Sequence, residues 1–487
     1  MPKVHVAGVE RHGEKIILPK GMKTADAIES LKRQLRYDEE KVAMSFDFNF
    51  FVWDGAYALS QVMQQRYGFV FGEKSGFFGS EPPQLMGIEI ELGKFVQVPW
   101  GRFSVPSVEA QFECSYTEKE GKLLFKLAVV TKHMYEEEVK SLHTAVLDYL
   151  KTNSIYKGKA FGIRFTDDRG KNLLANGEIP TPKFLDVAKN REKELVFPQH
   201  VAEQIDTNLF TVLERLEECR ESKIPVKRGI LLAGHYGVGK TLTAYVAAHK
   251  AVTNGITYIY CQKPEEFSNV MRMAAQYTPC LVFCEDVDRI VPSDRDKGVD
   301  ELINIIDGVE TKNSEIITVF TTNAVDDVNQ SLLRPGRMDA VIVVERSDAA
   351  AVQQLIRNYA GQYLKPGTDL TEIGELLKNN IPAVIREVCE RSKLAALRRM
   401  EKGSKLKFIP LEALKEASLT MKIQLDLLNR EEPEEKDGEE QIADGLKAIA
   451  TAIKNPTVIT TPTSRTAKMP TMPDMTPTNG EVSSTKG

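Results

Sequence analysis

A glycine-rich stretch ending in Lys-Thr, GHYGVGKT at residues 234–241, combines the residue types that can enclose a phosphate group. Glycine lets the backbone wrap closely around an anion with its N–H groups pointing inward. The spacing G-x-x-x-x-G-K-S/T lets Lys240 reach the β- and γ-phosphates of a nucleotide and lets the Thr241 hydroxyl ligate Mg²⁺. The candidate phosphate cradle comprises Gly234, His235, Tyr236, Gly237, Val238, Gly239, Lys240, Thr241 and Leu242.

Polar side chains end two apolar runs further along the chain, and they suit a metal ion and a reacting water. Glu285 and Asp286 follow the run CLVFC, and Asn323 follows the run IITVFTT. Phosphoryl transfer to water needs one carboxylate near Mg²⁺ and another that orients or deprotonates the water. Asn323 could hold that water between the acid and the γ-phosphate. Arg334 and Arg337 stand three residues apart before the next apolar run.

The segments around these residues favour a parallel α/β sheet. GILLA at residues 229–233 is strand-like, and TLTAYVAAHKAV at residues 241–252 is typical of a helix. A helix that starts at the glycine turn presents the positive end of its dipole to an anion. β-like and α-like runs alternate through residues 191–345, which is the pattern of an α/β fold.

Changes in residue pattern and composition divide the chain into four predicted regions. Residues 1–190 are expected to form an α+β domain, because residues 87–105 and 110–131 alternate like strands and residues 136–153 carry an apolar helical stripe. The other predicted regions are a large α/β domain at 191–345, a helical lid at 346–430, and an acidic linker with a short amphipathic helix and a disordered tail at 431–487.

The composition is that of an ordinary globular protein, and it restricts the partners. The chain has 487 residues and a net charge of −5, which gives no global attraction to nucleic acid or to an anionic membrane. No apolar run approaches the roughly 18 residues of a membrane helix, and the N-terminus lacks the apolar core of a signal peptide. Six scattered cysteines without a CxxC pair argue against zinc and disulfides. We expect a cytoplasmic protein without a membrane partner.

The order of the motifs resembles that of the AAA ATPases: a Walker A motif, a Walker B motif, a sensor 1 Asn, and LLRPGRMD of the second region of homology. The resemblance covers residues from about 195 to 430. It implies a Rossmann-like αβα core followed by a small helical lid, with ATP and Mg²⁺ as cofactors. The stretch FPQHV at residues 197–201 resembles the linker that touches the adenine in the family. The N-terminal region resembles no family that we identify.

The acidic pair departs from the usual order of the family, which is Asp followed by Glu. By position, Glu285 and Thr241 would hold Mg²⁺ and Asp286 would face the water, and an exchange of the two acids' roles stays open. Aspartate is one methylene shorter than glutamate, so slow hydrolysis is an alternative. Similar Glu-Asp pairs occur in a branch that resembles the mitochondrial respiratory-complex assembly AAA proteins.

Arg334 and Arg337 match the positions from which family members reach into the active site of a neighbouring subunit. Such an arginine finger contributes on the order of 10³–10⁵ in rate. A repeating head-to-tail contact closes into a ring, and the resemblance implies a hexamer. Protein-threading members carry an aromatic-hydrophobic-glycine pore loop after the second strand. None is visible here, and Phe267, the nearest aromatic residue, is expected to pack its own helix.

The leading hypothesis is therefore a Mg²⁺-dependent ATP hydrolase that remodels or assembles a protein partner without processive threading. An unidentified protein client would bind the N-terminal domain or the tail. A DNA-transaction ATPase is one alternative, supported by the basic segment at residues 391–407 and weakened by the negative net charge. A nucleotide-gated structural ring with slow hydrolysis is another.

Overall fold

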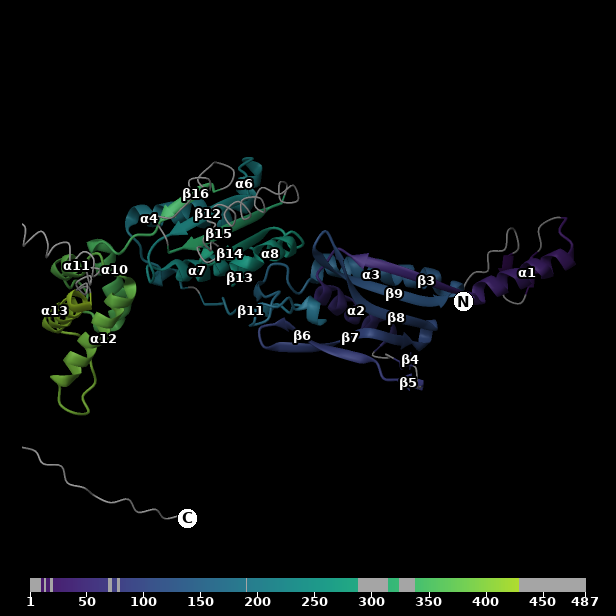
Figure 1. The fold of residues 1–487 in the computed structure, drawn as a ribbon, viewed down its shortest axis with the longest axis horizontal. Coiled ribbons are helices and arrows are strands. Elements are labelled where there is room, and N and C mark those ends of the chain that lie inside the picture. Colours follow the sequence, from purple (N-terminus) through teal and green to yellow (C-terminus); the bar gives the residue numbers. More distant parts are fainter. Residues whose placement is uncertain are drawn as a thin grey trace, which may run out of the picture. The chain divides into compact units, whose positions relative to one another are not determined.

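The computed structural model describes residues 10–12, 15–17, 21–68, 72–76, 79–189, 191–287, 314–323 and 338–428. Their helices and strands are labelled in Figure 1. Contacts within the chain divide it into two units, residues 1–423 and 424–487. Arg334, Arg337 and the predicted amphipathic helix and tail lie outside the described residues.

A five-stranded antiparallel sheet is the centre of the N-terminal part. Its strand order is β3-β9-β8-β7-β6. The strands are β3 (Lys41–Phe48), β6 (Gln84–Glu91), β7 (Lys94–Val105), β8 (Ala110–Lys119) and β9 (Lys122–Lys132). Residues 87–105 and 110–131 were predicted as strands from their alternation, and both are confirmed as hairpins of this sheet.

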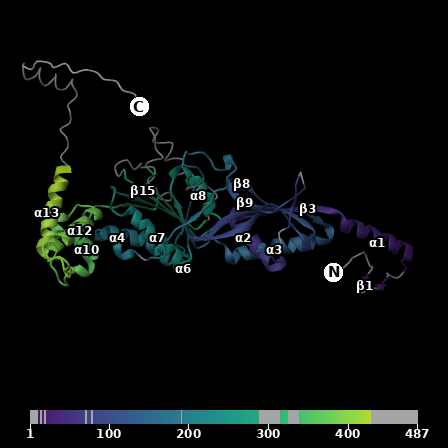
Figure 2. The ribbon, with the colours of Figure 1, turned by 90° about the horizontal axis from the view of Figure 1, so that it is seen from below.

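Two helices, α2 (Val52–Tyr67) and α3 (Glu136–Asn153), pack beside each other against this sheet (Figures 1 and 2). The predicted apolar stripe of α3 is confirmed, since its members are all buried: Val139, Leu142, Val146 and Leu150. In α2, a Cβ atom on Gly55 would overlap the Phe125 side chain on β9. Glycine therefore allows a closer approach of helix to sheet than any other residue would.

Shorter elements complete this part of the chain. They are β1 (Glu10–His12), β2 (Lys15–Ile17), α1 (Thr24–Glu39), β4 (Lys74–Gly76) and β5 (Gly79–Glu81). β1 pairs with β2, and β4 pairs with β5, each as a short antiparallel hairpin.

The second sheet has seven strands in the order β11-β10-β13-β14-β15-β12-β16. They are β10 (Ala160–Ile163), β11 (Lys183–Phe184), β12 (Arg228–Ala233), β13 (Thr257–Cys261), β14 (Cys280–Cys284), β15 (Ile316–Thr322) and β16 (Ala340–Val343). Each pairing is parallel except that of β10 with β11, so the carboxyl ends of six strands meet at one edge. β10 and β11 precede residue 191, where we predicted the α/β domain to begin.

Helices cover both faces of this sheet, as expected for an αβα core. α4 (Gln199–Ile205), α5 (Thr211–Glu214) and α7 (Lys240–Thr253) share one apolar cluster with alternate residues of the central strands. α8 (Phe267–Ala274) packs on the opposite face, in a cluster that continues into the core of the five-stranded sheet. The short helix α6 (Leu216–Glu221) follows α5. The predicted fold class, an αβα core preceded by an α+β region, is confirmed.

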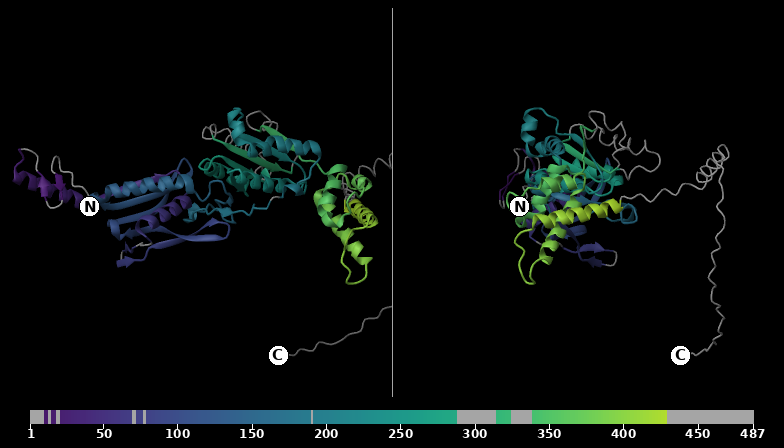
Figure 3. Two further views of the ribbon diagram at one scale, coloured as in Figure 1. Left: turned by 180° about the vertical axis from the view of Figure 1, so that it is seen from behind. Right: turned by 90° about the vertical axis from the view of Figure 1, so that its left-hand side faces the viewer.

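A group of helices follows the second sheet, in the region predicted as a lid. It comprises α10 (Ala349–Ala360), α11 (Thr371–Leu377), α12 (Pro382–Arg398) and α13 (Leu411–Leu428), drawn green to yellow in Figure 3. α10 packs against both α11 and α12. The Asp348 side chain caps α10 by accepting a hydrogen bond from the Ala351 N–H at 2.7 Å.

Candidate nucleotide-binding site

The glycine-rich turn lies between the end of β12 and the start of α7, as the sequence predicts. Gly239 has φ +113°, which residues with a Cβ atom rarely adopt, and it is the N-cap residue of α7. A Cβ atom there would lie 3.2 Å from Cε1 of Phe197, the first residue of the FPQHV stretch. At Gly237 a Cβ atom would lie 2.9 Å from Cδ1 of Ile381, just before α12. The turn is thus closely covered, and the positive φ values of Gly237 and Gly239 favour glycine at both positions.

Lys240 is the first residue of α7 and is almost entirely buried, with 7% of its surface exposed. Its ammonium group donates hydrogen bonds to the carbonyl oxygens of Gly234 and His235 and to Oδ1 of Asn323, the last at 2.8 Å. The lysine is therefore held inside the turn. Thr241, the next residue of α7, is exposed.

Asn323 links the lysine to the acidic pair. It follows β15, and its Nδ2 donates to Oδ1 of Asp286 at 2.9 Å. Asp286 follows β14 with φ +51°, a left-handed backbone that is uncommon outside glycine. The Asp286 N–H donates to the Thr321 hydroxyl at 3.0 Å. The adjacent strand therefore holds both the backbone and the side chain of Asp286.

Glu285 is the first residue after β14, and its two carboxylate oxygens have different surroundings. Oε2 accepts a hydrogen bond from the Tyr260 hydroxyl at 2.6 Å. Oε1 is buried and has no hydrogen-bond partner among the described residues. A buried oxygen without a partner costs free energy unless a ligand satisfies it. This orphaned atom, together with the Thr241 hydroxyl, fits the oxygen ligands that Mg²⁺ prefers.

The structure thus brings Lys240, Asn323 and Asp286 together, with Glu285 next to Asp286 in the chain, at the carboxyl edge of the sheet. These residues come from three neighbouring elements, α7, β14 and β15. Sequence reasoning missed Tyr260. A polar aromatic residue near the end of β13 is a signal, but its partner is identified only once β13 is known to pair with β14.

The segment after β13 contains no exposed aromatic residue of the pore-loop kind. Phe267 is 1% exposed and packs against Phe320 with ring centroids 5.0 Å apart, which confirms its predicted packing role. Just before it, Glu266 is buried and accepts hydrogen bonds from the Phe165 and Thr166 N–H groups at 2.9 Å each.

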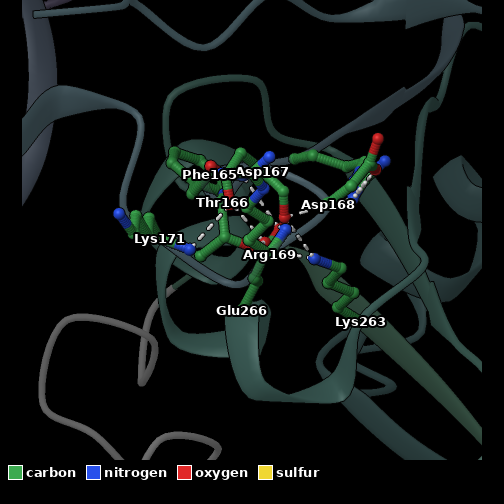
Figure 4. Close-up of polar contacts among 9 residues, drawn as sticks. Phe165, Thr166, Asp167, Asp168, Arg169, Lys171, Lys263 and Glu266 are labelled. Atoms are coloured by element: carbon green, nitrogen blue, oxygen red, sulfur yellow. Dashed lines mark hydrogen bonds and ion pairs between the residues drawn. The ribbon is translucent and has the colours of Figure 1, made fainter. Parts of the chain in front are cut away.

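These contacts hold residues 164–171, the anchored loop, which follows β10 (Figure 4). Lys263 donates to the Thr166 hydroxyl at 2.9 Å and to the Asp167 carbonyl oxygen at 3.0 Å. Oδ1 of Asp167 accepts the Arg169 and Lys171 N–H groups at 2.8 Å each and closes the turn. Lys263 and Glu266, two polar residues after β13, therefore bind a loop of the same chain, and this contact was not predicted from the sequence.

Within the ranges that the structure describes, no helix has both the length and the apolar character that a bilayer crossing requires. The six cysteines are all unpaired and buried.

Comparison with known proteins finds similarity in the region that contains the candidate nucleotide site. Residues 230–346 match the family described as "ATPase family associated with various cellular activities (AAA)". The chain is 26% identical over 265 residues to the Cell division cycle protein 48 homolog of Archaeoglobus fulgidus, covering 50% of this chain and 34% of that protein. It is 24% identical over 208 residues to the Proteasome-activating nucleotidase of Methanococcus maripaludis, covering 39% and 50%.

A third relative is the 26S proteasome regulatory subunit 8 homolog of Schizosaccharomyces pombe, which is 32% identical over 196 residues, covering 36% of this chain and 48% of that protein. The matches to these three relatives cover half of their length or less. The resemblance of the Glu-Asp pair to one branch of the family stays a prediction. These matches agree with the order of the motifs: residues 230–346 are similar to the AAA ATPase family.

Proposed function

We propose that the protein is a Mg²⁺-dependent ATP hydrolase that acts as a homo-oligomeric ring and remodels or assembles a protein partner. The observation that carries the proposal is the hydrogen-bonded series Lys240–Asn323–Asp286 at the glycine turn, together with Glu285, which precedes Asp286 in the chain and whose Oε1 has no partner among the described residues. A positively charged hydrogen-bond donor, an amide and two carboxylates at one edge of a sheet are the groups that phosphoryl transfer to water requires.

In this proposal each residue has one task. Lys240 binds the β- and γ-phosphates, exchanging part of its hydrogen bonding to the turn for phosphate oxygens. Thr241 and Glu285 hold Mg²⁺, which neutralises charge on the phosphates when it is bound. Asp286 orients the water and accepts its proton, and the Asn323 amide keeps the Asp286 carboxylate directed at the site. The left-handed backbone of Asp286 re-aims this short side chain, and strained backbone of this kind clusters at functional sites.

Arg334 and Arg337 supply the remaining positive charge from a neighbouring protomer. The site of one protomer is then incomplete, so hydrolysis requires assembly, and the proposed ring is a hexamer. The N-terminal domain, helped by the tail, selects the client. The burial of Phe267 and the use of Glu266 to hold the anchored loop support action without processive threading.

Phosphate release over many turnovers tests the catalytic assignment. We expect Asp286→Asn to retain nucleotide binding and to lose about 10²–10⁴-fold in rate, the range for a positioned general base. Glu265→Gln is a matched control, because Glu265 is an exposed carboxylate just after β13. Equal rates for the parent and Asp286→Asn would remove Asp286 from the mechanism. A normal rate for Lys240→Ala would contradict the proposed phosphate site.

A further inference from the structure

The Tyr260 hydroxyl makes the two oxygens of the Glu285 carboxylate different. It donates a hydrogen bond to Oε2 at 2.6 Å. Oε1 is buried without a partner among the described residues. One oxygen is therefore already used inside the protein, and the other is left for a ligand.

The strand register explains why this tyrosine reaches this acid. β13 and β14 are parallel, and Tyr260 lies opposite Phe283. Side chains alternate along a strand, so Tyr260, Phe283 and Glu285 lie on the same face. Phe283 packs in the apolar cluster that contains Ala244 and Ala247 of α7, and Tyr260 packs against the same cluster. The contact thus lies on the side of the sheet that carries the helix of the glycine turn.

A tyrosine hydroxyl has one proton to donate, and here it is donated to Oε2 of Glu285. A neutral hydroxyl can fix the rotation of a carboxylate without cancelling its charge. Mg²⁺ demands near-ideal octahedral geometry, so it gains from a carboxylate that offers one oxygen in a fixed direction.

We propose that Tyr260 is a positioning residue, which locks Glu285 through Oε2 so that Oε1 is the oxygen presented to the metal of the nucleotide complex. The inference rests on the proposed function of the site. Outer partners that orient a metal ligand typically contribute 10–100-fold in metal affinity or activity. A hydrogen bond with a merely structural role would change stability and leave metal affinity unchanged.

The test is Tyr260→Phe in the full chain, which removes the hydroxyl and keeps the ring. Tyr258→Phe is the matched control, because Tyr258 is buried two residues earlier on the same face of β13. Mn²⁺ is titrated into the complex with ADP, and free Mn²⁺ is measured by electron paramagnetic resonance. We expect Tyr260→Phe to weaken Mn²⁺ binding by about tenfold. Tyr258→Phe should bind Mn²⁺ like the parent.

Three further measurements separate positioning from folding. ADP affinity in EDTA should be unchanged in Tyr260→Phe. At saturating Mg²⁺ and ATP, kcat should fall while KM for ATP stays within about twofold, because only the geometry of the metal ligand has changed. In a Glu285→Gln background, adding Tyr260→Phe should have no further effect on Mn²⁺ binding, since the carboxylate that it orients is gone.

Two results would overturn the inference in different ways. Parent-like Mn²⁺ affinity and kcat in Tyr260→Phe, with normal turnover by the parent, would refute the role of Tyr260 alone. A parent protein that bound neither ADP nor Mn²⁺–ADP would refute the proposed function and the inference with it.

Discussion

Asp54 provides a pH-dependent test of the contact between the N-terminal part and the seven-stranded sheet. It lies on α2, is completely buried, and accepts hydrogen bonds from the Ser154 hydroxyl (2.6 Å), the Ile155 N–H (3.0 Å) and the Tyr277 hydroxyl (3.2 Å). Tyr277 follows α8, so one carboxylate joins the two parts. Burial outweighs these hydrogen bonds and raises the pKa of Asp54 from 3.8 to about 6.

The size and sign of the effect follow from proton linkage. Between about pH 4 and pH 6 the folded protein keeps a proton on Asp54 that the unfolded chain has released. The free energy of unfolding therefore falls as the pH rises through this window. Above about pH 6, Asp54 contributes no further pH dependence. A shift of about two pKa units corresponds to about 3 kcal/mol.

Asp54→Asn removes this titration while keeping a carbonyl oxygen for the Ile155 N–H. Urea unfolding followed by tryptophan fluorescence suits the measurement, because the two tryptophans, Trp53 and Trp100, lie in the N-terminal part with ring centroids 5.0 Å apart. From pH 4 to pH 7, the stability of the parent should fall by about 3 kcal/mol relative to Asp54→Asn. Asp148→Asn, at an exposed position on α3, should leave the pH profile of the parent unchanged.

The reasoning is refuted if the free energies of unfolding of the parent and Asp54→Asn differ by the same amount from pH 4 to pH 7. Such a result would mean that Asp54 is ionised in the folded protein at pH 4, so that its hydrogen bonds outweigh its burial. The free energy of unfolding of the parent could instead rise with pH relative to that of Asp54→Asn. This result would mean that the pKa of Asp54 is lower in the folded protein than in the unfolded chain, so the sign of the linkage would be reversed.

Three other outcomes are expected. Arg337→Ala should bind nucleotide and lose most hydrolysis, and mixing it with Lys240→Ala should restore part of the rate; no rescue at any mixing ratio would count against a shared site. Glu266→Gln should speed amide hydrogen exchange in the anchored loop by tenfold or more, since a hydrogen bond to a charged group contributes about 1.5–3 kcal/mol. Unchanged exchange would show that Glu266 does not hold the loop. Gly55→Ala should lower the free energy of unfolding by about 1–3 kcal/mol through overpacking, measured by urea unfolding, and a neutral effect would show that Phe125 can move away.

The candidate site could be predicted from the sequence because its parts are encoded locally. The glycine turn, the acids at 285–286 and Asn323 each stand directly after an apolar strand, and parallel strands bring their carboxyl ends to one edge. The N-terminal strands and the stripe of α3 were predictable for a similar reason, since alternation and helical spacing are visible within a few residues. These features need no knowledge of distant contacts.

The parts that were not predicted depend on pairing across long sequence separations. β10 is four buried residues without alternation, and it joins the sheet by pairing Ala160 with Tyr258, far along the chain. Nothing in its sequence distinguishes it from other short apolar runs. The contacts of Tyr260 with Glu285, and of Glu266 with the anchored loop, likewise exist only once β10, β13 and β14 lie side by side.

The pairing of β13 and α8 with their neighbours gives the nucleotide site a continuous connection to the rest of the chain. Tyr260, near the end of β13, contacts Glu285; Glu266 follows it and holds the anchored loop; Tyr277, after α8, contacts Asp54. A rotation of the Glu285 carboxylate on metal binding would therefore act on the strand whose continuation packs against the N-terminal part. At each end of this segment a tyrosine hydroxyl donates a hydrogen bond to a carboxylate, so a single Tyr→Phe change removes either bond. If the two contacts are energetically coupled, Tyr260→Phe and Tyr277→Phe should have non-additive effects on the rate of hydrolysis, because residues that act independently give additive free energies.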